Sequence, residues 1–475
     1  MFIQYVTKKL YLKAAREGSY EALYKLGQME SPNEQSESEC VRISIIHYEI
    51  EKVVIPDGMT KIGYKAFFGC VSLQSVVIPN SVTEIGENAF TMCTNLKNLV
   101  IPNSVTQIGK NAFNVCSCLE SIVIPDSVIF IGNDAFSGCV SLQSVVIPNS
   151  VTEIGEGAFF GCESLQNVVI PNSVTKIGHY TFSCCERLES IVIPDSVIFI
   201  GNNVFSNCVS LQSVVIPNSV TEIGENAFAD CRRLEGIVIP NSVAVIGKNA
   251  FAGCRCLEGI VIPNSVAEIG ENAFADCRRL EIVVIPSSVT VIGKNAFAGC
   301  RCLESIVIPN SVAVIRENAF NACVSLKNIF NSNSVTEIGE NAFAGCISLQ
   351  SVVIPNSVTA ISKNTFFGCE SLQSVAIPSS VTEIGENAFS YCESLKSVVI
   401  SNSVAVIGKN AFAGCKSLQS VVIPNSVISI EEGAFGRCYS LFKLTMPQKL
   451  RHISIEHITK DHLFDEPWNG KIEYY

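Results

Sequence analysis

The fold is decided by one short stretch, residues 76–104, which reads VVIPNSVTEIGENAFTMCTNLKNLVIPNS. Its first proline, Pro79, returns 23 residues later as Pro102, and this step continues to Pro447 without insertion or deletion, with serine in place of proline at two positions. Counted from the proline as position 0, Ile occupies position 6, Phe position 11, Cys position 14 and Leu position 17 in 17 consecutive coils. A period of this length predicts one solenoid of stacked coils rather than several globular domains.

Each coil is expected to contain a strand at the residues that precede the proline. In the first regular coil these are Ser75–Ile78, where strand alternation would turn Val76 and Ile78 inward and Val77 outward. Ile85 to Cys93 is expected to form a turn and a short helical or 3₁₀ segment that carries Phe90 and Cys93 inward. The predicted fold is therefore a right-handed stack of coils with a parallel β-sheet and short helical, 3₁₀ or turn segments.

The ends of the chain differ from the array. Residues 1–40 contain small and apolar side chains at spacings of three and four, which predicts a helical N-terminal segment followed by a polar linker. Residues 41–450 are expected to form the solenoid of about 18 coils, and residues 451–475 are expected to cap its last open edge. Within the array, Arg316–Ser334 departs most from the pattern, which indicates a loosened coil or a local contact site.

Composition limits the functions that the chain can have. Charged residues make up 16% of the sequence against roughly 25% in ordinary soluble domains. The net charge of −11 and the lack of a continuous basic stripe argue against a nucleic-acid partner. No apolar run reaches the length of about 18 residues that a membrane span needs. The order of residues in Met1–Leu10 predicts no signal peptide, which favours a cytoplasmic location.

Cysteine is abundant, with 22 residues in the chain. Seventeen of them occupy position 14, where a column of small buried thiols is the expected arrangement. Disulfides between neighbouring coils are the alternative, because equivalent residues lie one strand spacing apart. Four coils carry a second thiol close to the column, as in Cys254-Arg255-Cys256, and its side chain is expected at the surface.

The coil resembles a known repeat. The pattern Ile-Pro-Asn-Ser-Val-Thr-Glu-Ile-Gly-Glu-Asn-Ala-Phe-x-x-Cys-x-x-Leu is similar to the 23-residue BspA-type leucine-rich repeat, and residues 52–446 match it. The family occurs in surface proteins of anaerobic bacteria and mucosal protist parasites, and some members are implicated in adhesion to host matrix proteins. The resemblance therefore implies a protein partner, such as a host or cell-surface protein, and a surface location, which stays open beside the cytoplasmic one.

Three surface columns are candidates for binding. Valine holds the outward strand position, position 21, in most coils, and an exposed column of this kind predicts a face for protein binding or self-association. Arginine repeats at position 15 in four coils, where glutamate follows three residues later and either neutralises it or leaves it free for an anionic partner. At position 8, Lys and Glu nearly alternate from residue 225 to residue 432, which favours correct stacking. The predicted partner-binding residues are Val192, Val215, Val238, Val261, Val284, Arg232, Arg255, Arg278 and Arg301.

The sequence favours a function without catalysis. An active site needs unlike residues that converge on one place, and repetition of one unit works against this. The Ile-Gly-Glu-Asn turn has a single glycine per coil, so no phosphate-binding loop and no cofactor are expected, and no metal site is predicted. The interpretation is a protein–protein interaction scaffold of the adhesin type that binds through its sheet face. A purely structural or self-associating repeat protein is the alternative.

Overall fold

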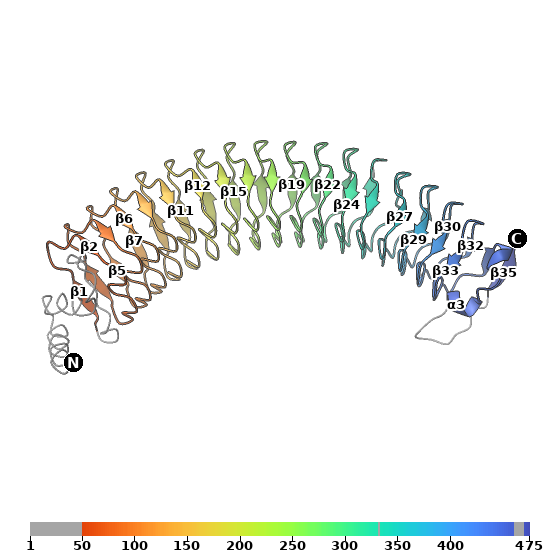
Figure 1. The fold of residues 1–475 in the computed structure, drawn as a ribbon, viewed down its shortest axis with the longest axis horizontal. Helices are drawn as coiled ribbons and strands as arrows, with labels where there is room; N and C mark the ends of the chain where they lie inside the picture. The colour runs from red at the N-terminus through yellow and green to blue at the C-terminus, as the bar shows by residue number, and fades with distance from the viewer. Residues whose placement is uncertain (1–49, 331–332, 460–469) are drawn as a thin grey trace, which may run out of the picture. The chain divides into compact units, whose positions relative to one another are not determined.

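The computed structural model describes residues 50–330, 333–459 and 470–475. The chain divides into two compact units, one up to Ser242 and one from Val243, which are described separately. Each unit is a stack of similar coils, and most coils have two short strands (Figure 1). This confirms a solenoid with parallel sheets, whereas the helical segment expected within residues 1–40 lies outside the described residues.

In the N-terminal unit, one side of the stack carries the strands that precede each proline. They are β1 (Lys52–Val54), β3 (Ser75–Val77), β5 (Asn98–Leu99), β7 (Ser121–Val123), β9 (Ser144–Val146), β11 (Asn167–Val169), β13 (Ser190–Val192), β15 (Ser213–Val215) and β17 (Gly236–Val238). Neighbouring strands pair in parallel and in register, so that Val146 lies beside Val169 and Val169 beside Val192. We call this side of the coil the sheet side.

A second side of the same unit carries strands of two residues at positions 5 and 6. They are β2 (Lys61–Ile62), β4 (Glu84–Ile85), β6 (Gln107–Ile108), β8 (Phe130–Ile131), β10 (Glu153–Ile154), β12 (Lys176–Ile177), β14 (Phe199–Ile200) and β16 (Glu222–Ile223). The isoleucine of each pair is buried, and it lies beside its equivalent in the next coil, as Ile85 does beside Ile108.

The C-terminal unit repeats both sides. Its sheet side contains β19 (Gly259–Val261), β21 (Ile282–Val284), β23 (Ser305–Val307), β25 (Asn328–Phe330), β28 (Ser374–Ala376), β30 (Ser397–Val399), β32 (Ser420–Val422), β34 (Lys443–Met446) and β35 (Lys471–Tyr474). Its second side contains β18 (Val245–Ile246), β20 (Glu268–Ile269), β22 (Val291–Ile292), β24 (Val314–Ile315), β26 (Glu337–Ile338), β27 (Ala360–Ile361), β29 (Glu383–Ile384), β31 (Val406–Ile407) and β33 (Ser429–Ile430). Between β25 and β28 the ladder is reduced to single bridges through Ser351, so the coil after the irregular Arg316–Ser334 segment has no strand on this side.

The third side of each coil, positions 7–14, is a chain of tight turns, and we call it the turn side. In the coil of Pro79, every second N–H group donates to the carbonyl three residues back, as Ala89 does to Gly86. The N–H groups between them donate to the next coil, as Phe90 does to Ala112 at 2.7 Å. The turn alternative is therefore the observed one, and the helical or 3₁₀ alternative for this segment is wrong.

Left-handed residues explain why no helix forms on the turn side. Position 9 has a positive φ, for example 56° at Asn88, and position 13 does the same at Met92 with 62°. Asparagine, aspartate and glycine dominate position 9 because these residues adopt the left-handed conformation at the lowest cost. Two left-handed residues per coil interrupt the right-handed backbone that an α- or 3₁₀-helix requires.

The core consists of the repeated apolar columns. The phenylalanines at position 11 are fully buried, and their rings stack from coil to coil, as Phe113 stacks on Phe136 with 5.3 Å between centroids and 9° between planes. Hydroxyl groups tie the coils together at the edges of this core. Ser150 Oγ donates to the carbonyl of Val128 at 2.7 Å, and Thr83 Oγ1 donates to that of Thr60 at 3.1 Å. These columns therefore satisfy carbonyl groups of the preceding coil.

The last coil of the C-terminal unit is followed by a 3₁₀-helix, η1 (Gln448–Leu450), and a short helix, α3 (Ile455–Thr459). The N–H groups of Gly433 and Phe435 donate to the carbonyls of His457 and Ile458, each at 2.8 Å. Strand β35 pairs in parallel with β34 and extends the sheet by one strand. Backbone groups that an eighteenth regular coil would satisfy therefore find partners in α3 and β35.

Candidate functional site

The outward valines form an exposed column on the sheet side of each unit. In the N-terminal unit, the side chains of Val192, Val215 and Val238 are 69%, 67% and 78% exposed, whereas the preceding strand residues are buried. The period of two along a strand produces this alternation, and the in-register pairing places equivalent valines side by side. In the C-terminal unit, Val261 pairs with Val284, and both are exposed.

In the N-terminal unit the valine column is one side chain wide. There the residues at position 19, two before each valine, also point outward and are small or polar, as Ser190, Ser213 and Gly236 are. In the C-terminal unit, Ile282 at this position is apolar and 64% exposed. The isoleucine that follows each valine is buried, as Ile216 and Ile239 are. A flat apolar stripe bordered by small side chains leaves room for another protein surface to approach the strands closely.

The predicted arginine column is only partly exposed. In the N-terminal unit, Arg232 is exposed, and its Nε lies 3.4 Å from Asp230 Oδ1 of the same coil. In the C-terminal unit, Arg301 is exposed, but Arg255 and Arg278 are half-buried, and the Nε atoms of both make no hydrogen bond within the described part of the chain. Arg278 Nε is 3.6 Å from Asp276 Oδ1.

The expected glutamate partners of these arginines bind elsewhere. Glu258 pairs with Arg279 of the next coil rather than with Arg255, and Glu304 lies 3.0 Å from Lys327. Arg232 and Arg278 are instead close to the aspartate two residues before them, which occupies the left-handed position 13. Because acidic and basic groups are mixed in this way, the column is not a strongly positive surface.

The alternating Lys and Glu residues at position 8 form ion pairs between neighbouring coils of the C-terminal unit. The Nζ–Oε distances are 2.7–3.2 Å in the pairs Lys248–Glu271, Lys294–Glu317, Lys363–Glu386 and Lys409–Glu432. All of these side chains are solvent-accessible, so water and salt weaken each pair and it contributes little to stability. Their role in stacking was predictable from the alternation.

The cysteines at position 14 are buried free thiols that take part in hydrogen bonding. Cys93 Sγ donates to the carbonyl of Phe67, which lies 26 residues earlier, at 3.1 Å, and most later coils repeat this contact. Burial raises the pKa of the Cys139 thiol to about 12. A thiol that stays protonated is a poor nucleophile and a poor metal ligand, so this column belongs to the core. The second thiols, such as Cys256, are half-buried.

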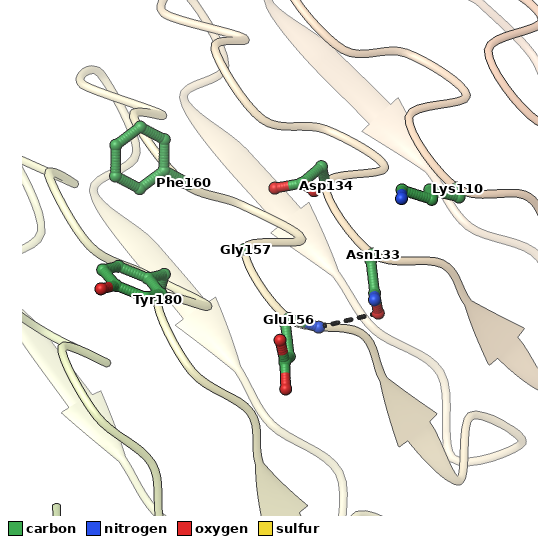
Figure 2. A pocket seen from close by; sticks show the side chains of 7 residues that line it. All are labelled: Lys110, Asn133, Asp134, Glu156, Gly157, Phe160 and Tyr180. Carbon is green, nitrogen blue, oxygen red and sulfur yellow. Dashed lines mark hydrogen bonds between the residues drawn. The ribbon is translucent and has the colours of Figure 1, made fainter.

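Sequence reasoning missed a hollow on the turn side of the N-terminal unit. It has a volume of about 500 Å³ and lies around Gly157, with Phe160 and Tyr180 on one side and Asp134, Asn133 and Lys110 on the other (Figure 2). The signal was present in the sequence. Position 9, which is asparagine in most coils, is Asp134, Gly157 and Tyr180 in three consecutive ones.

Among residues 50–330, 333–459 and 470–475, no three His, Cys, Asp or Glu side chains are grouped so that they could hold a metal ion. In the same residues, the structure contains no helix with the length and apolar character of a membrane span.

Comparison with known proteins identifies the repeat. The sequence model of the BspA type leucine rich repeat region (6 copies) matches residues 46–165, 129–258, 244–373 and 336–461. The chain belongs to the BspA-type leucine-rich repeat family. No curated protein matches the sequence.

Solved structures of bacterial leucine-rich repeat proteins are similar to this BspA-type chain. One from Bacteroides ovatus is 27% identical, with a TM-score of 0.56, and the match covers 94% of this chain and 97% of that one. A leucine rich cell surface protein from Faecalibacterium prausnitzii is 31% identical, with a TM-score of 0.43 and coverage of 74% and 88%. A T. pallidum leucine rich repeat protein is 36% identical, with a TM-score of 0.31 and coverage of 39% and 78%.

Proposed function

We propose that this chain is a non-catalytic interaction scaffold of the adhesin type, which binds a protein partner through the valine column of its sheet side. Membership in the BspA-type leucine-rich repeat family supports a protein partner. The observation that carries the proposal is the exposure of the column, since Val192, Val215 and Val238 each leave two thirds or more of the side chain accessible. The arginine column has a secondary role, because Arg232 and Arg278 lie beside carboxylates of their own coils and Arg255 is half-buried.

Exposed valines are not needed to hold the coils together. The inward strand residues and the stacked phenylalanines already fill the interior, whereas the outward valines are exposed and lie beside their equivalents in adjacent coils. An apolar side chain in water gains about 25 cal/mol for each Å² that a partner covers. A repeated column therefore offers a small gain per coil that accumulates over a long interface.

Self-association through the same column is the alternative, because two copies could cover each other's valines. A photo-cross-linking amino acid placed at Val215 distinguishes the two functions in cells that naturally make the protein. The proposal predicts an adduct with a different protein at this position and none at Glu153, an exposed residue of β10 on the second side. Adducts only with the chain itself would establish self-association, and equal adducts at both positions would contradict a sheet-side interface.

A loss-of-binding variant complements the cross-link. Val192, Val215 and Val238 are replaced together by lysine, which keeps the outward strand position but removes the apolar contact. Binding of the cross-linked partner to the purified variant is expected to fall at least about tenfold, since each buried valine contributes on the order of 1 kcal/mol or more. Unchanged binding would sink the proposal, and the unchanged melting temperature serves as the control for folding.

The finer division of the chain is part of the same proposal. We propose a helical segment and linker at residues 1–40, the solenoid at 41–450 and a cap at 451–475. The contacts of α3 and β35 with the last coil support the cap. Right-handed winding is expected because crossover connections between parallel strands are right-handed in nearly all proteins.

A further inference from the structure

The hollow around Gly157 exists because one side chain is missing from the position-9 column. In most coils this position holds an asparagine in the left-handed conformation, as at Asn88 and Asn111. Gly157 has the same conformation, with a φ of 62°, but it has no side chain. A Cβ atom built on Gly157 would overlap Asp134 Oδ1. The Asp134 carboxylate therefore reaches into the place that a position-9 side chain of this coil would take, and it lines the hollow together with Gly157 (Figure 2).

The acidic groups at the hollow lack partners. Within the described residues, the side-chain carboxylates of Asp134 and Glu156 make no hydrogen bond or ion pair. Lys110 lies near enough to Asp134 to influence it electrostatically, but it forms no ion pair with it. Burial and the charge of Glu156 raise the pKa of Asp134 despite Lys110. Two carboxylates and one ammonium group leave the hollow with a net negative charge, which a cation would balance.

Aromatic rings stand on the other side of Gly157. Phe160 follows it by three residues, and Tyr180 occupies position 9 of the next coil. Their side chains are 39% and 48% exposed, although aromatic side chains are expensive to leave in water. The faces of aromatic rings attract cations, and Lys65 already lies 5.1 Å from the ring centroids of Tyr64 and Phe68 on the same side of an earlier coil.

We propose that this hollow is a binding site for an organic cation, an alkylammonium or guanidinium group, held between the rings of Phe160 and Tyr180 and the carboxylates of Asp134 and Glu156. The cation is either a free small molecule or a lysine or arginine side chain of another protein. The site lies on the turn side, whereas the valine column is on the sheet side, so this inference does not rest on the proposed function.

A second segment of the chain, nearly identical in sequence, can be compared with this site. Residues 124–159 and 193–228 are nearly identical in sequence, and each places an asparagine side chain at the base of the turn. Asn133 Oδ1 accepts from the N–H of Glu156 at 3.1 Å, and Asn202 Oδ1 accepts from that of Glu225 at 2.9 Å. The second copy differs because Asn226 stands where the first has Gly157, and Ala229 stands where the first has Phe160. No hollow is expected in the second copy for this reason.

The variant Gly157→Asn tests the site with little cost in folding. Asparagine is the usual residue at position 9, and Asn226 adopts a φ of 54°. The Asp134 carboxylate must turn aside to admit the new side chain, which then fills the space. The variant Asp134→Asn removes a charge and keeps the shape, since Asn203 holds the equivalent position in the second copy. Both variants are expected to keep the melting temperature of the natural chain.

Ligand binding to the full chain is measured by NMR. The first pair of probes is choline and its uncharged isostere 3,3-dimethylbutan-1-ol, and the second is capped Gly-Lys-Gly and capped Gly-Gln-Gly peptide. The charged member of at least one pair is expected to bind at least about tenfold more tightly than its neutral partner, and either variant should remove this preference. Preference for choline indicates a free cation, and preference for the lysine peptide indicates a protein side chain. Equal binding within both pairs, or binding unchanged in Gly157→Asn, would overturn the proposal.

Discussion

The turn side and the sheet side of each coil are built by opposite rules. On the sheet side of the N-terminal unit, regular ladders join short strands, and every second side chain, such as Val146, is left in water. On the turn side, rings stack, thiols bind carbonyls, and backbones approach so closely that a Cβ on Gly132 would lie 2.5 Å from the carbonyl carbon of Gly109. The turn side therefore packs its side chains and backbones between the coils, whereas the sheet side leaves its outward side chains exposed.

The irregular coil of the C-terminal unit shows the same difference. After β25 the sheet side loses a strand and keeps only single bridges through Ser351. The turn side continues without a break, because the rings of Phe320 and Phe343 stack at 5.3 Å with 2° between their planes. Arg316 replaces the usual glycine, and yet its N–H group still donates to Ile292 at 3.0 Å. In this coil the turn side keeps its contacts although the sheet side lacks a strand.

The largest expected effect is the destabilisation of the turn side at alkaline pH. Burial raises the pKa of the thiols of Cys70 and Cys139 to about 12, whereas an exposed thiol titrates near 9.0. Below about pH 9 the thiols are protonated in both the folded and the unfolded chain, so they do not lower the free energy of unfolding. Between pH 9 and 12 the unfolded chain loses protons that the folded chain keeps, so the free energy of unfolding falls as pH rises. Melting followed by circular dichroism should show a steep drop over this range.

The control for the alkaline effect removes thiols outside the column. Replacing the half-buried Cys118 and Cys184 by serine should leave the drop unchanged. A melting temperature that stays level from pH 8.5 to pH 11 would show that the column thiols do not resist ionisation and would contradict the buried arrangement. The apolar columns of the sheet side have no ionisable group, so these columns do not contribute to the effect.

Much of the core could be predicted from the sequence, because a buried column keeps its residue type. Phe90, Cys93 and the inward Val76 were placed correctly by period and strand alternation alone. The turn conformation was not, because a segment such as Ile85–Cys93 has apolar spacing compatible with a short helix. The left-handed residues that exclude the helix were visible as the asparagine column, whose φ of about 55° is the physical reason for its repetition.

The candidate sites were predictable to different degrees. The exposed valine column follows from the period of two, so its residues were named in advance. The partners of the arginines were not, because Glu258 reaches across to Arg279, and sequence spacing does not say which neighbouring coil a long side chain contacts. The hollow at Gly157 depends on a missing side chain, and its shape appears only when the neighbouring Asp134 and Tyr180 are placed in space.

Removing one ring from the turn side is the next largest effect. Phe136 is fully buried and stacks on Phe113 and Phe159, each with 5.3 Å between centroids. Phe136→Ala should lower the free energy of unfolding by about 3–5 kcal/mol, because it leaves a cavity between two coils. Urea unfolding followed by circular dichroism measures the loss. The matched sheet-side variant Val146→Ala should change it by less than about 0.5 kcal/mol, and comparable losses in the two variants would refute the division of roles.

Two glycines give a smaller but sharper contrast. Gly132→Ala on the turn side places a methyl group against the backbone of Gly109 and Lys110 and should cost about 1–3 kcal/mol. Gly236→Ala on the sheet side meets no atom within 4 Å and should stabilise the chain by up to about 1 kcal/mol, because alanine restricts the unfolded state. Thermal unfolding should therefore shift in opposite directions. Stabilisation by both alanines would mean that the coils can separate freely on the turn side.

The smallest effect is expected from a substitution of valine by glycine that stabilises the chain, although this change usually destabilises a protein. Val115 occupies position 13 with a φ of 58°, a conformation that β-branched residues rarely adopt. Val115→Gly should relieve about 1–2 kcal/mol of strain and lose about 1 kcal/mol through the greater freedom of the unfolded chain, so a net gain below about 1 kcal/mol is expected. Val169→Gly, in strand β11 on the sheet side, has no strain to relieve and should cost about 1 kcal/mol. Since both variants make the same chemical change and increase the freedom of the unfolded chain equally, the difference between their melting temperatures reports the native state, in which Val115 is strained and half-buried and Val169 is exposed. A lower melting temperature for Val115→Gly than for Val169→Gly would show that the left-handed turn stores no strain.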